Sequence, residues 1–529
     1  MTGRRADTVA GSTVGPPGHR WSCGWRPRSR TLRRSRRAPR GRRCAPAGST
    51  ATRRSSRRCS SPRAWHSSCR CSAGRALTFD EAVTLSNVQL PYDLDRYLRA
   101  DATPPLYPLL ARAWLKLFGT TLVAARALSA LASAASVVAL FQLGRRFLDA
   151  RTGLFAAALL LASRCQIYFA HEARPYALVL LIVIASFHVL LLLLERVTWR
   201  RLALLCLLDA ALLHTHYVAA FALCAQTLAA LPWRGQSPRT FLAILAAQVG
   251  AVLLVVPLAL FIWLTLWPLP MAGWLPAPTL RGIPHELAKL TGSGLVLTLE
   301  LLLVVAGAIA LLGARREAQA APAPRRTLAA LALWSVVPLV VAYLASSIEP
   351  VFLGRYLLYV TPGWYLLVGA AAARLPVART LGTTLIVALC ALSLAGAWRS
   401  PLQRTDWAIA ADRARAATAD GALTVIVPAH EILPFAWHFS PEAFRDLDHL
   451  PRRLRELGVV GVSRIADAAQ FARLPRELLV VVPRPLGASV DALAPALAAA
   501  GRAPWQREDL RAFVLLRSPA PAPDASPAS

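Results

Sequence analysis

The chain has 529 residues, of which 55% are hydrophobic, and it carries a formal net charge of +32. This hydrophobic share exceeds that of an ordinary soluble domain, and the apolar residues come in runs of about 18–25, long enough to cross a bilayer core. The charge does not indicate nucleic-acid binding, because residues 1–75 alone hold twenty arginines and one acid, Asp7, unlike a basic stripe on a folded module. We therefore expect the lipid bilayer, and no nucleic acid, as a partner.

Residues 1–75 consist largely of Arg, Ser, Pro, Gly, Cys and Trp, with no hydrophobic period. A disordered basic arm and an unusual targeting peptide are two interpretations, although the apolar core of a signal peptide is lacking. We favour a third hypothesis, in which GC-rich DNA translated in a wrong frame before about Leu77 has replaced a first membrane helix. Five of the nine cysteines lie here, and the other four lie in apolar runs, without the spacing of a metal site.

Ten transmembrane helices are predicted from residue 121 onward, and the fourth and fifth are short and nearly continuous. Their ranges are 121–143, 152–169, 175–194, 201–214, 216–232, 241–266, 294–313, 327–346, 355–373 and 378–398. Alternate loops hold fourteen arginines, whereas the opposite loops hold only Arg174, Arg281, Lys289 and Arg355. Because positive loops face the cytoplasm, the second set is expected on the periplasmic side. This orientation requires an eleventh helix before residue 76, which supports the hypothesis of a replaced first helix.

The predicted fold class is an all-α polytopic membrane protein with a small C-terminal periplasmic α/β domain. The α/β domain is inferred from three short apolar runs, 423–427, 478–482 and 512–516, with helix-like stretches between them. The expected organisation is an Arg-rich segment at 1–75, a first periplasmic loop at 76–120, a transmembrane domain at 121–398, the α/β domain at 399–517 and a disordered tail at 518–529.

Polar residues collect at the outer ends of the predicted helices, and ionisable groups at a membrane are candidates for function. Asp80 and Glu81 form an adjacent acid pair in the first outer loop. Neighbouring carboxylates repel each other, which suits one of them to accept a proton from a hydroxyl as a general base. An ordinary solvated acid pair on a loop is the alternative.

Two arginines lie at the same outer side. The first, Arg174, lies in the motif His171-Glu172-Ala173-Arg174 between two predicted helices. Arg174 could bind a phosphate through two hydrogen bonds, with Glu172 orienting the guanidinium. Alternatively, Glu172 and Arg174 could form a structural ion pair. Arg355 and Tyr356 open a later helix, where they bind a phosphate or anchor the helix at the interface.

Two histidines, His214 and His216, are two residues apart. On a helix they would point about 200° apart, so a hydrogen-bonded pair is favoured over a shared metal ion. No metal ligand is predicted, and a divalent metal is left open as a cofactor. Four further ionisable residues, Arg126, Arg164, Asp209 and Glu300, fall inside or near predicted helices. Arg164, Asp209 and Glu300 could each be a buried pairing partner. Arg126 is expected to extend its side chain outward to the membrane surface.

In their order, these motifs resemble the bacterial family-39-type glycosyltransferases, which are related to protein O-mannosyltransferases and lipid A aminoarabinose transferases. The matching stretches are Phe79-Asp80-Glu81-Ala82, residues 104–119 with Arg126 and Ser129, residues 168–178, 215–221 and 352–367, and Asp406-Trp407. The resemblance covers roughly residues 77–410. Two departures are Thr103, where relatives often carry a polar or basic residue before the PPL run, and the missing first helix.

The resemblance implies a GT-C fold and an enzyme of the bacterial inner membrane. Such an enzyme moves a sugar from a polyprenyl-phosphate donor to a periplasmic acceptor hydroxyl, usually with inversion, and the acceptor is left open among a protein, a lipid and a glycan. It implies that Asp80 is the catalytic base, with Glu81 beside it. The residues expected at the donor phosphate or substrate are His171, Glu172, Arg174, Tyr176, His216, Arg355 and Tyr356.

Two other functions are considered. A transporter or flippase of lipid-linked sugars would place ionisable groups near the midplane between repeats, whereas here the polar motifs lie at outer helix ends. An inactive relative that binds polyprenyl phosphate as a scaffold would tolerate substitution of Asp80, and an enzyme would not.

Overall fold

The computed structural model describes residues 77–89, 98, 103–231, 237–266, 277–313, 322–375, 379–399, 407–446, 449–471, 474, 476–483, 494–499, 502, 505–510 and 513–520. All of these residues lie in one compact unit, Arg63–Ser529. The hypothesis about residues 1–75 and the motif residue Asp406 fall outside the described residues.

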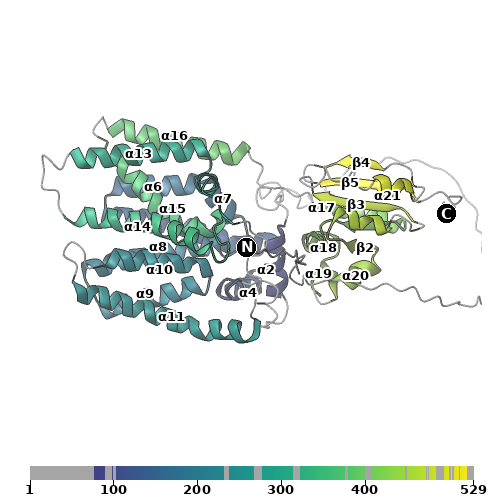
Figure 1. The fold of residues 1–529 in the computed structure, drawn as a ribbon, viewed down its shortest axis with the longest axis horizontal. Coiled ribbons are helices and arrows are strands. Elements are labelled where there is room, and N and C mark those ends of the chain that lie inside the picture. The colour runs from purple at the N-terminus through teal and green to yellow at the C-terminus, as the bar shows by residue number, and fades with distance from the viewer. Residues whose placement is uncertain are drawn as a thin grey trace, which may run out of the picture. The chain divides into compact units, whose positions relative to one another are not determined.

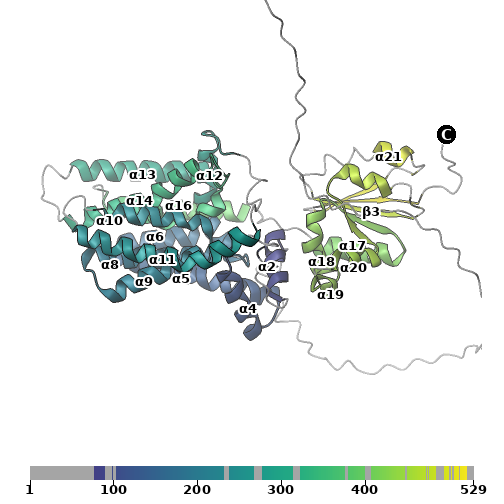
Figure 2. The same ribbon diagram turned by 60° about the horizontal axis from the view of Figure 1, so that its bottom comes forward.

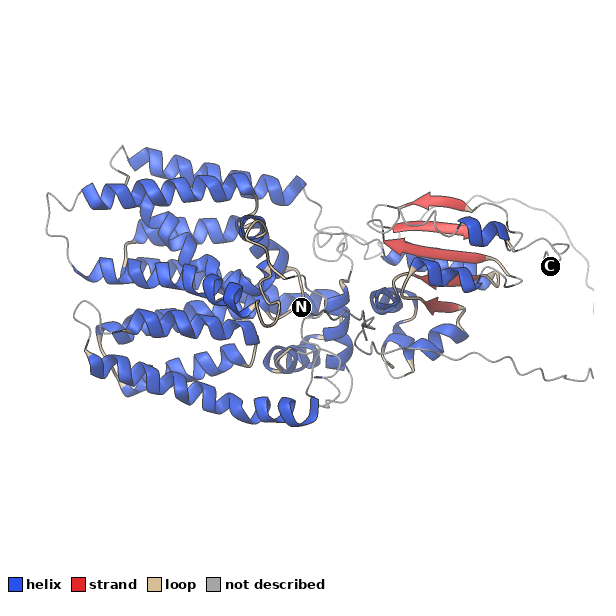
Figure 3. Cartoon of the chain, in the orientation of Figure 1, coloured by secondary structure: helices blue, strands red, loops and turns tan. Residues whose placement is uncertain are grey.

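Helices make up most of the described chain between residues 106 and 399, and the long ones run side by side (Figures 1 and 3). They are α4 (Leu106–Phe118), α5 (Leu122–Phe147), α6 (Ala150–Ala162), α7 (Arg164–Ala170), α8 (Tyr176–Glu195), α9 (Trp199–Leu213), η2 (Tyr217–Ala219), α10 (Ala220–Ala230), α11 (Pro238–Leu266), α12 (Ile283–Thr291), α13 (Gly294–Gly313), α14 (Pro322–Ala345), η4 (Gly354–Val360), α15 (Thr361–Ala373) and α16 (Arg379–Arg399).

Within the described residues, six helices are long and apolar enough to cross a membrane: α5, α8, α11, α14, η4 continued by α15, and α16. Two bent pairs, α6 with α7 and α12 with α13, turn by 62° and 88° and bring the number to eight if each is one span. The chain is a multi-pass membrane protein of mainly helical fold, as the sequence predicts.

The ten predicted spans are not all long enough in the structure. The fourth and fifth correspond to α9, with 15 residues, and α10, with 11, whereas a crossing helix needs about 20. The backbone leaves the α-helix at His214-Thr215-His216, where the His214 N–H still bonds to the Ala210 oxygen but the chain then enters the 3₁₀ turn η2. This polar break divides one apolar run into two short helices.

Close packing between the long helices depends on small residues. A Cβ atom on Gly144 of α5 would lie 2.5 Å from the Cα of Gly153 on α6, so only glycine permits this approach. Small residues serve the same purpose at helix contacts in other membrane proteins. Deeper in the bundle, Phe187 stacks on Trp334 with 4.0 Å between ring centroids.

The C-terminal part contains a five-stranded mixed sheet in the order β2-β1-β3-β5-β4. Its strands are β1 (Leu423–Ile426), β2 (Val459–Gly461), β3 (Leu478–Pro483), β4 (Gln506–Asp509) and β5 (Phe513–Ser518). β1 pairs in parallel with β2 and β3, and β5 pairs antiparallel with β3 and β4. The three predicted strands are present. β2 was not predicted because it has only three residues, and β4 was not predicted because its four residues are polar and exposed.

Side chains of the central strands alternate between two apolar layers, as the pleat of a strand requires. Ile426, Val481 and Leu515 pack in the layer that holds Trp407 and Phe435, whereas Val425 and Val480 point to the opposite layer. Figure 2 shows α17 (Trp407–Ala419), α18 (Ile432–Phe439) and α20 (Leu450–Glu456) on one side of the sheet and α21 (Ala494–Ala499) on the other. The remaining short helices are η5 (Ala429–Glu431), α19 (Pro441–Phe444) and η6 (Ile465–Phe471).

Candidate active site

The short helix α2 (Phe79–Gln89) carries both predicted acids in its first turn. It begins with a capping box: the Glu81 N–H donates to Thr78 Oγ1 at 3.2 Å, and the Thr78 N–H donates to Glu81 Oε2 at 3.2 Å. A threonine followed three residues later by a glutamate is the usual sequence signal for such a start. The predicted first loop is therefore helical at Asp80 and Glu81.

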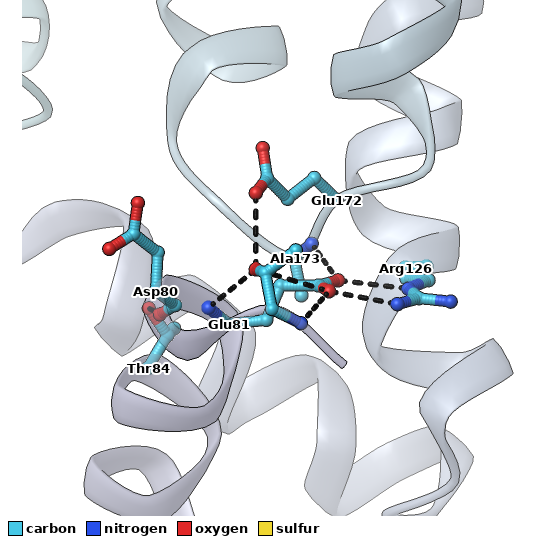
Figure 4. Close-up of polar contacts among 7 residues, drawn as sticks. Asp80, Glu81, Thr84, Arg126, Glu172 and Ala173 are labelled. Atoms are coloured by element: carbon cyan, nitrogen blue, oxygen red, sulfur yellow. Dashed lines mark hydrogen bonds and ion pairs between the residues drawn. The ribbon is translucent and has the colours of Figure 1, made fainter. Parts of the chain in front are cut away.

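Glu81 is fully buried and holds α2 against two neighbouring segments. Arg126 donates to it twice, from Nε to Oε1 and from Nη2 to Oε2, both at 2.8 Å, and the Ala173 N–H donates to Oε1 at 2.9 Å (Figure 4). The guanidinium of Arg126 is itself only 2% exposed, so the expectation that it snorkels outward is wrong. A paired guanidinium is stable inside the protein because both charges are compensated.

Asp80 points away from this buried pair (Figure 4). Its Oδ2 accepts a hydrogen bond from Nη1 of Arg355 at 2.9 Å, and the two side chains are 29% and 31% exposed. Of the two adjacent acids, Asp80 is therefore the one whose carboxylate a substrate can reach. The role of Glu81 in catalysis stays a prediction.

Arg174 lies behind Asp80 and is 6% exposed. Its Nη1 donates to Thr84 Oγ1 at 2.9 Å and to the Asp80 carbonyl oxygen at 3.3 Å, which fixes the guanidinium beside the first turn of α2. Two residues earlier in the chain, Glu172 Oε1 accepts a hydrogen bond from the Thr78 hydroxyl at 3.2 Å. The predicted motif between two helices thus binds α2 at two points, through Glu172 just before the helix and through Arg174 in its first turns.

Three aromatic rings among the predicted site residues lie close together. His216 is 8% exposed and lies between Tyr176, with 5.7 Å between ring centroids, and Tyr356, with 5.1 Å. The Arg355 guanidinium lies 5.4 Å from the centroid of the Tyr356 ring. These rings come from the start of α8, the break after α9 and the start of η4, so three distant segments meet at one end of the bundle.

The remaining predicted residues take other places. The Nδ1 atom of His171 is 2.8 Å from the carbonyl oxygen of Ile167, and that of His214 is 2.9 Å from the Ala210 oxygen, so both rings bond within their own helical turns. Among the described residues, no group of three or more His, Cys, Asp or Glu side chains is arranged to hold a metal ion.

Two intramembrane acids have neutral partners. Asp209 Oδ1 accepts from the Ser186 hydroxyl at 2.5 Å and from Gln226 Nε2 at 3.2 Å, and Glu300 Oε2 accepts from Trp364 Nε1 at 2.7 Å. Both were expected to be buried pairing partners. Their hydrogen bonds join neighbouring helices, as is usual for polar side chains inside a bundle.

Several residues of the site were not singled out from the sequence. Thr78 and Thr84 bind the acid-bearing turn, and the Tyr107 hydroxyl lies 2.9 Å from Ser129 Oγ, which in turn donates to the Arg174 carbonyl at 3.3 Å. The T-x-x-E pattern at 78–81 was the signal that could have identified the start of α2. The roles of Thr84 and Tyr107 depend on contacts between distant segments.

Residues 102–263 match the family of dolichyl-phosphate-mannose-protein mannosyltransferases. This segment is therefore similar to a family of membrane glycosyltransferases. The match confirms the predicted family resemblance and the predicted enzyme class, a GT-C glycosyltransferase. It includes Arg126, Arg174 and His216, whereas Asp80 and Arg355 lie outside the matched range.

Solved structures similar to this chain include ArnT from Cupriavidus metallidurans in the apo state, with 13% identity, a TM-score of 0.48 and coverage of 84% of this chain and 95% of that chain. The same protein bound to undecaprenyl phosphate has 13% identity, a TM-score of 0.47 and the same coverage. The Archaeoglobus fulgidus oligosaccharyltransferase with Zn and sulfate has 12% identity, a TM-score of 0.46 and coverage of 84% and 69%. No curated protein sequence matches the chain.

Proposed function

We propose that the protein transfers a sugar from a polyprenyl-phosphate donor to an acceptor hydroxyl at the periplasmic end of its helices. The observation that carries this proposal is the contact between Asp80 and Arg355. Their carboxylate and guanidinium are partly exposed, and Asp80 Oδ2 lies 2.9 Å from Arg355 Nη1. A carboxylate can accept the proton of the acceptor hydroxyl, and a guanidinium can bind a phosphate through paired hydrogen bonds. The matched family supports the donor class, because its description names a sugar carried on dolichyl phosphate.

The proposed step is a single displacement. The acceptor oxygen attacks the anomeric carbon, the bond between that carbon and the phosphate oxygen breaks, and the bonding electrons leave with polyprenyl phosphate. Asp80 takes the acceptor proton. Attack from the face opposite the leaving group inverts the configuration at the anomeric carbon.

Arg355 and Arg174 are proposed to stabilise the charge that builds up on the departing phosphate. Fixed cations aimed at developing charge contribute most when they are already in place before the reaction. Arg174 meets this condition through its bonds to Thr84 and the Asp80 carbonyl. Arg355 is held by Asp80 in the structure, so the donor phosphate would exchange with that carboxylate and free it to act as the base.

The site would lie at the membrane boundary, which suits a donor whose lipid tail stays in the bilayer. The bacterial inner membrane is the proposed location, with the arginine-rich loops in the cytoplasm. A protein, a lipid or a glycan would provide the acceptor hydroxyl.

A transfer assay with the full chain in membranes tests the proposal. Radiolabelled polyprenyl-phosphate sugars are supplied one at a time, and transfer of label into protein, lipid and glycan fractions is followed. Transfer from one donor supports the proposal and identifies the sugar. A well-folded protein that transfers from none of them would contradict it.

A further inference from the structure

The amphipathic helix α12 lies next to the segment that carries Arg355. It forms an 88° bend with α13, so it turns away from the direction of the membrane-spanning helix. From α12, Glu286 Oε2 accepts a hydrogen bond from the Gly354 N–H at 2.8 Å. Gly354 is the first residue of η4 and immediately precedes Arg355 and Tyr356.

The fit between α12 and Gly354 is tight. A Cβ atom on Gly354 would lie 3.0 Å from Glu286 Oε2 and 3.4 Å from the Glu286 carbonyl oxygen. Glu286 is 17% exposed, and its other carboxylate oxygen is bonded to Lys289 Nζ at 2.5 Å. One carboxylate therefore joins a neighbouring lysine on its own helix to the backbone at the start of η4.

Lys289 balances the charge of the Glu286 carboxylate. The interaction of this carboxylate with the segment that carries Arg355 is the hydrogen bond from the Gly354 N–H. A backbone N–H at the start of a helix has no partner within the helix. The bond from the Gly354 N–H to Glu286 fixes the Leu353–Gly354 peptide, immediately before the residue that carries the Arg355 side chain. Glu286 therefore bonds the backbone next to the residue whose guanidinium pairs with Asp80.

We propose that Glu286 is a positioning residue that sets the affinity for the donor phosphate by holding the backbone at Gly354, the residue before Arg355, in place. This inference rests on the proposed role of Arg355 as a phosphate ligand. It assigns a function to α12, which contributes no side chain to the predicted set of site residues. The relevant property of Glu286 is an oxygen that accepts a hydrogen bond, and its negative charge is secondary.

The test is the binding of polyprenyl phosphate alone to the purified full chain in detergent, which needs neither sugar nor acceptor. Glu286→Ala removes the acceptor and is expected to weaken binding about tenfold, a loss of the size expected for a hydrogen bond. Glu286→Gln keeps an acceptor oxygen without the charge and is expected to bind within about twofold of wild type. In transfer assays, Glu286→Ala should raise KM for the donor more than it lowers kcat.

Two further variants make the result specific. Glu349→Ala, an exposed acid five residues before Gly354, is the matched control and should bind as wild type does. Gly354→Ala should weaken binding in the same direction, because the Glu286 carboxylate must shift away from a Cβ atom 3.0 Å from its Oε2. This variant tests the proposal if Glu286→Ala does not fold.

The outcomes separate this inference from the proposed function. If Arg355→Gln loses affinity while Glu286→Ala binds normally, the inference about Glu286 is wrong and the role of Arg355 stands. If Arg355→Gln also binds polyprenyl phosphate normally, the proposed phosphate site is wrong. If Glu286→Gln is as weak as Glu286→Ala, charge and not hydrogen bonding is the relevant property, and the proposal fails in that form.

Discussion

Asp80 and Arg355 are separated by 275 positions in the chain, and their side chains meet at 2.9 Å. One side chain comes from the first turn of α2 and the other from the start of η4. Neither is fully buried, in contrast to the Glu81–Arg126 pair beside them. The two ion pairs therefore have different expected roles: the buried pair stabilises the fold, and the partly exposed pair is available to substrate.

The buried pair gives a prediction about stability. Glu81→Gln or Arg126→Met alone leaves one charge buried without its partner, which should lower the free energy of unfolding by about 3–5 kcal/mol. The double variant should lose less than the sum of the two, with a coupling of about 0.5–3 kcal/mol. Thermal unfolding in detergent measures this. Additive losses would mean that the two side chains do not stabilise each other.

Arg355 gives a prediction about catalysis. Arg355→Gln removes a fixed charge from the developing phosphate and should reduce transfer by about 10²–10³-fold. Arg355→Lys keeps the charge but loses the forked geometry, so an intermediate rate is expected. Arg281→Gln, which removes an exposed arginine from the turn before α12, is the matched control. Equal rates in Arg355→Gln and Arg281→Gln would remove Arg355 from the mechanism.

Glu431 of η5 gives a prediction about pH. Burial, and then the negative charge of Asp80, raise the pKa of Glu431 from 4.5 to about 7. The native protein therefore keeps a proton that the unfolded chain releases above about pH 4.5, so the free energy of unfolding should fall as pH rises from about 4.5 to 7. Glu431→Gln should lessen this fall and raise the melting temperature at pH 8. A melting temperature that varies with pH identically in both proteins would be the contrary result.

Much of the fold could be predicted from the sequence, because a bilayer imposes a simple requirement on length and polarity. Every predicted span corresponds to a helix or a bent pair. The number that cross could not be predicted, because hydropathy does not show that the helices on either side of the break at His214-Thr215-His216 have only 15 and 11 residues, or that α6 and α7 meet at 62°. Both edge strands were missed: β2 has only three residues, and the polar, exposed residues of β4 carry no strand pattern.

The candidate site was predicted as a set of residues but not as a set of contacts. Asp80, Arg174, His216 and Arg355 all lie at one end of the bundle in the structure. The sequence could not show that Glu81 would be buried against Arg126 while Asp80 faced Arg355, because adjacent residues on a helix point about 100° apart and only the neighbours decide which is covered. For the same reason Arg126 was expected at the surface.

The role of Asp80 as the base is the central claim, and one comparison tests it most directly. Transfer from the polyprenyl-phosphate sugar and binding of polyprenyl phosphate are measured for wild type and Asp80→Asn, which keeps the shape of the side chain but cannot accept the proton. We predict that transfer falls by about 10²–10⁴-fold while binding is retained. Transfer at the wild-type rate in Asp80→Asn would contradict the account and place the base elsewhere.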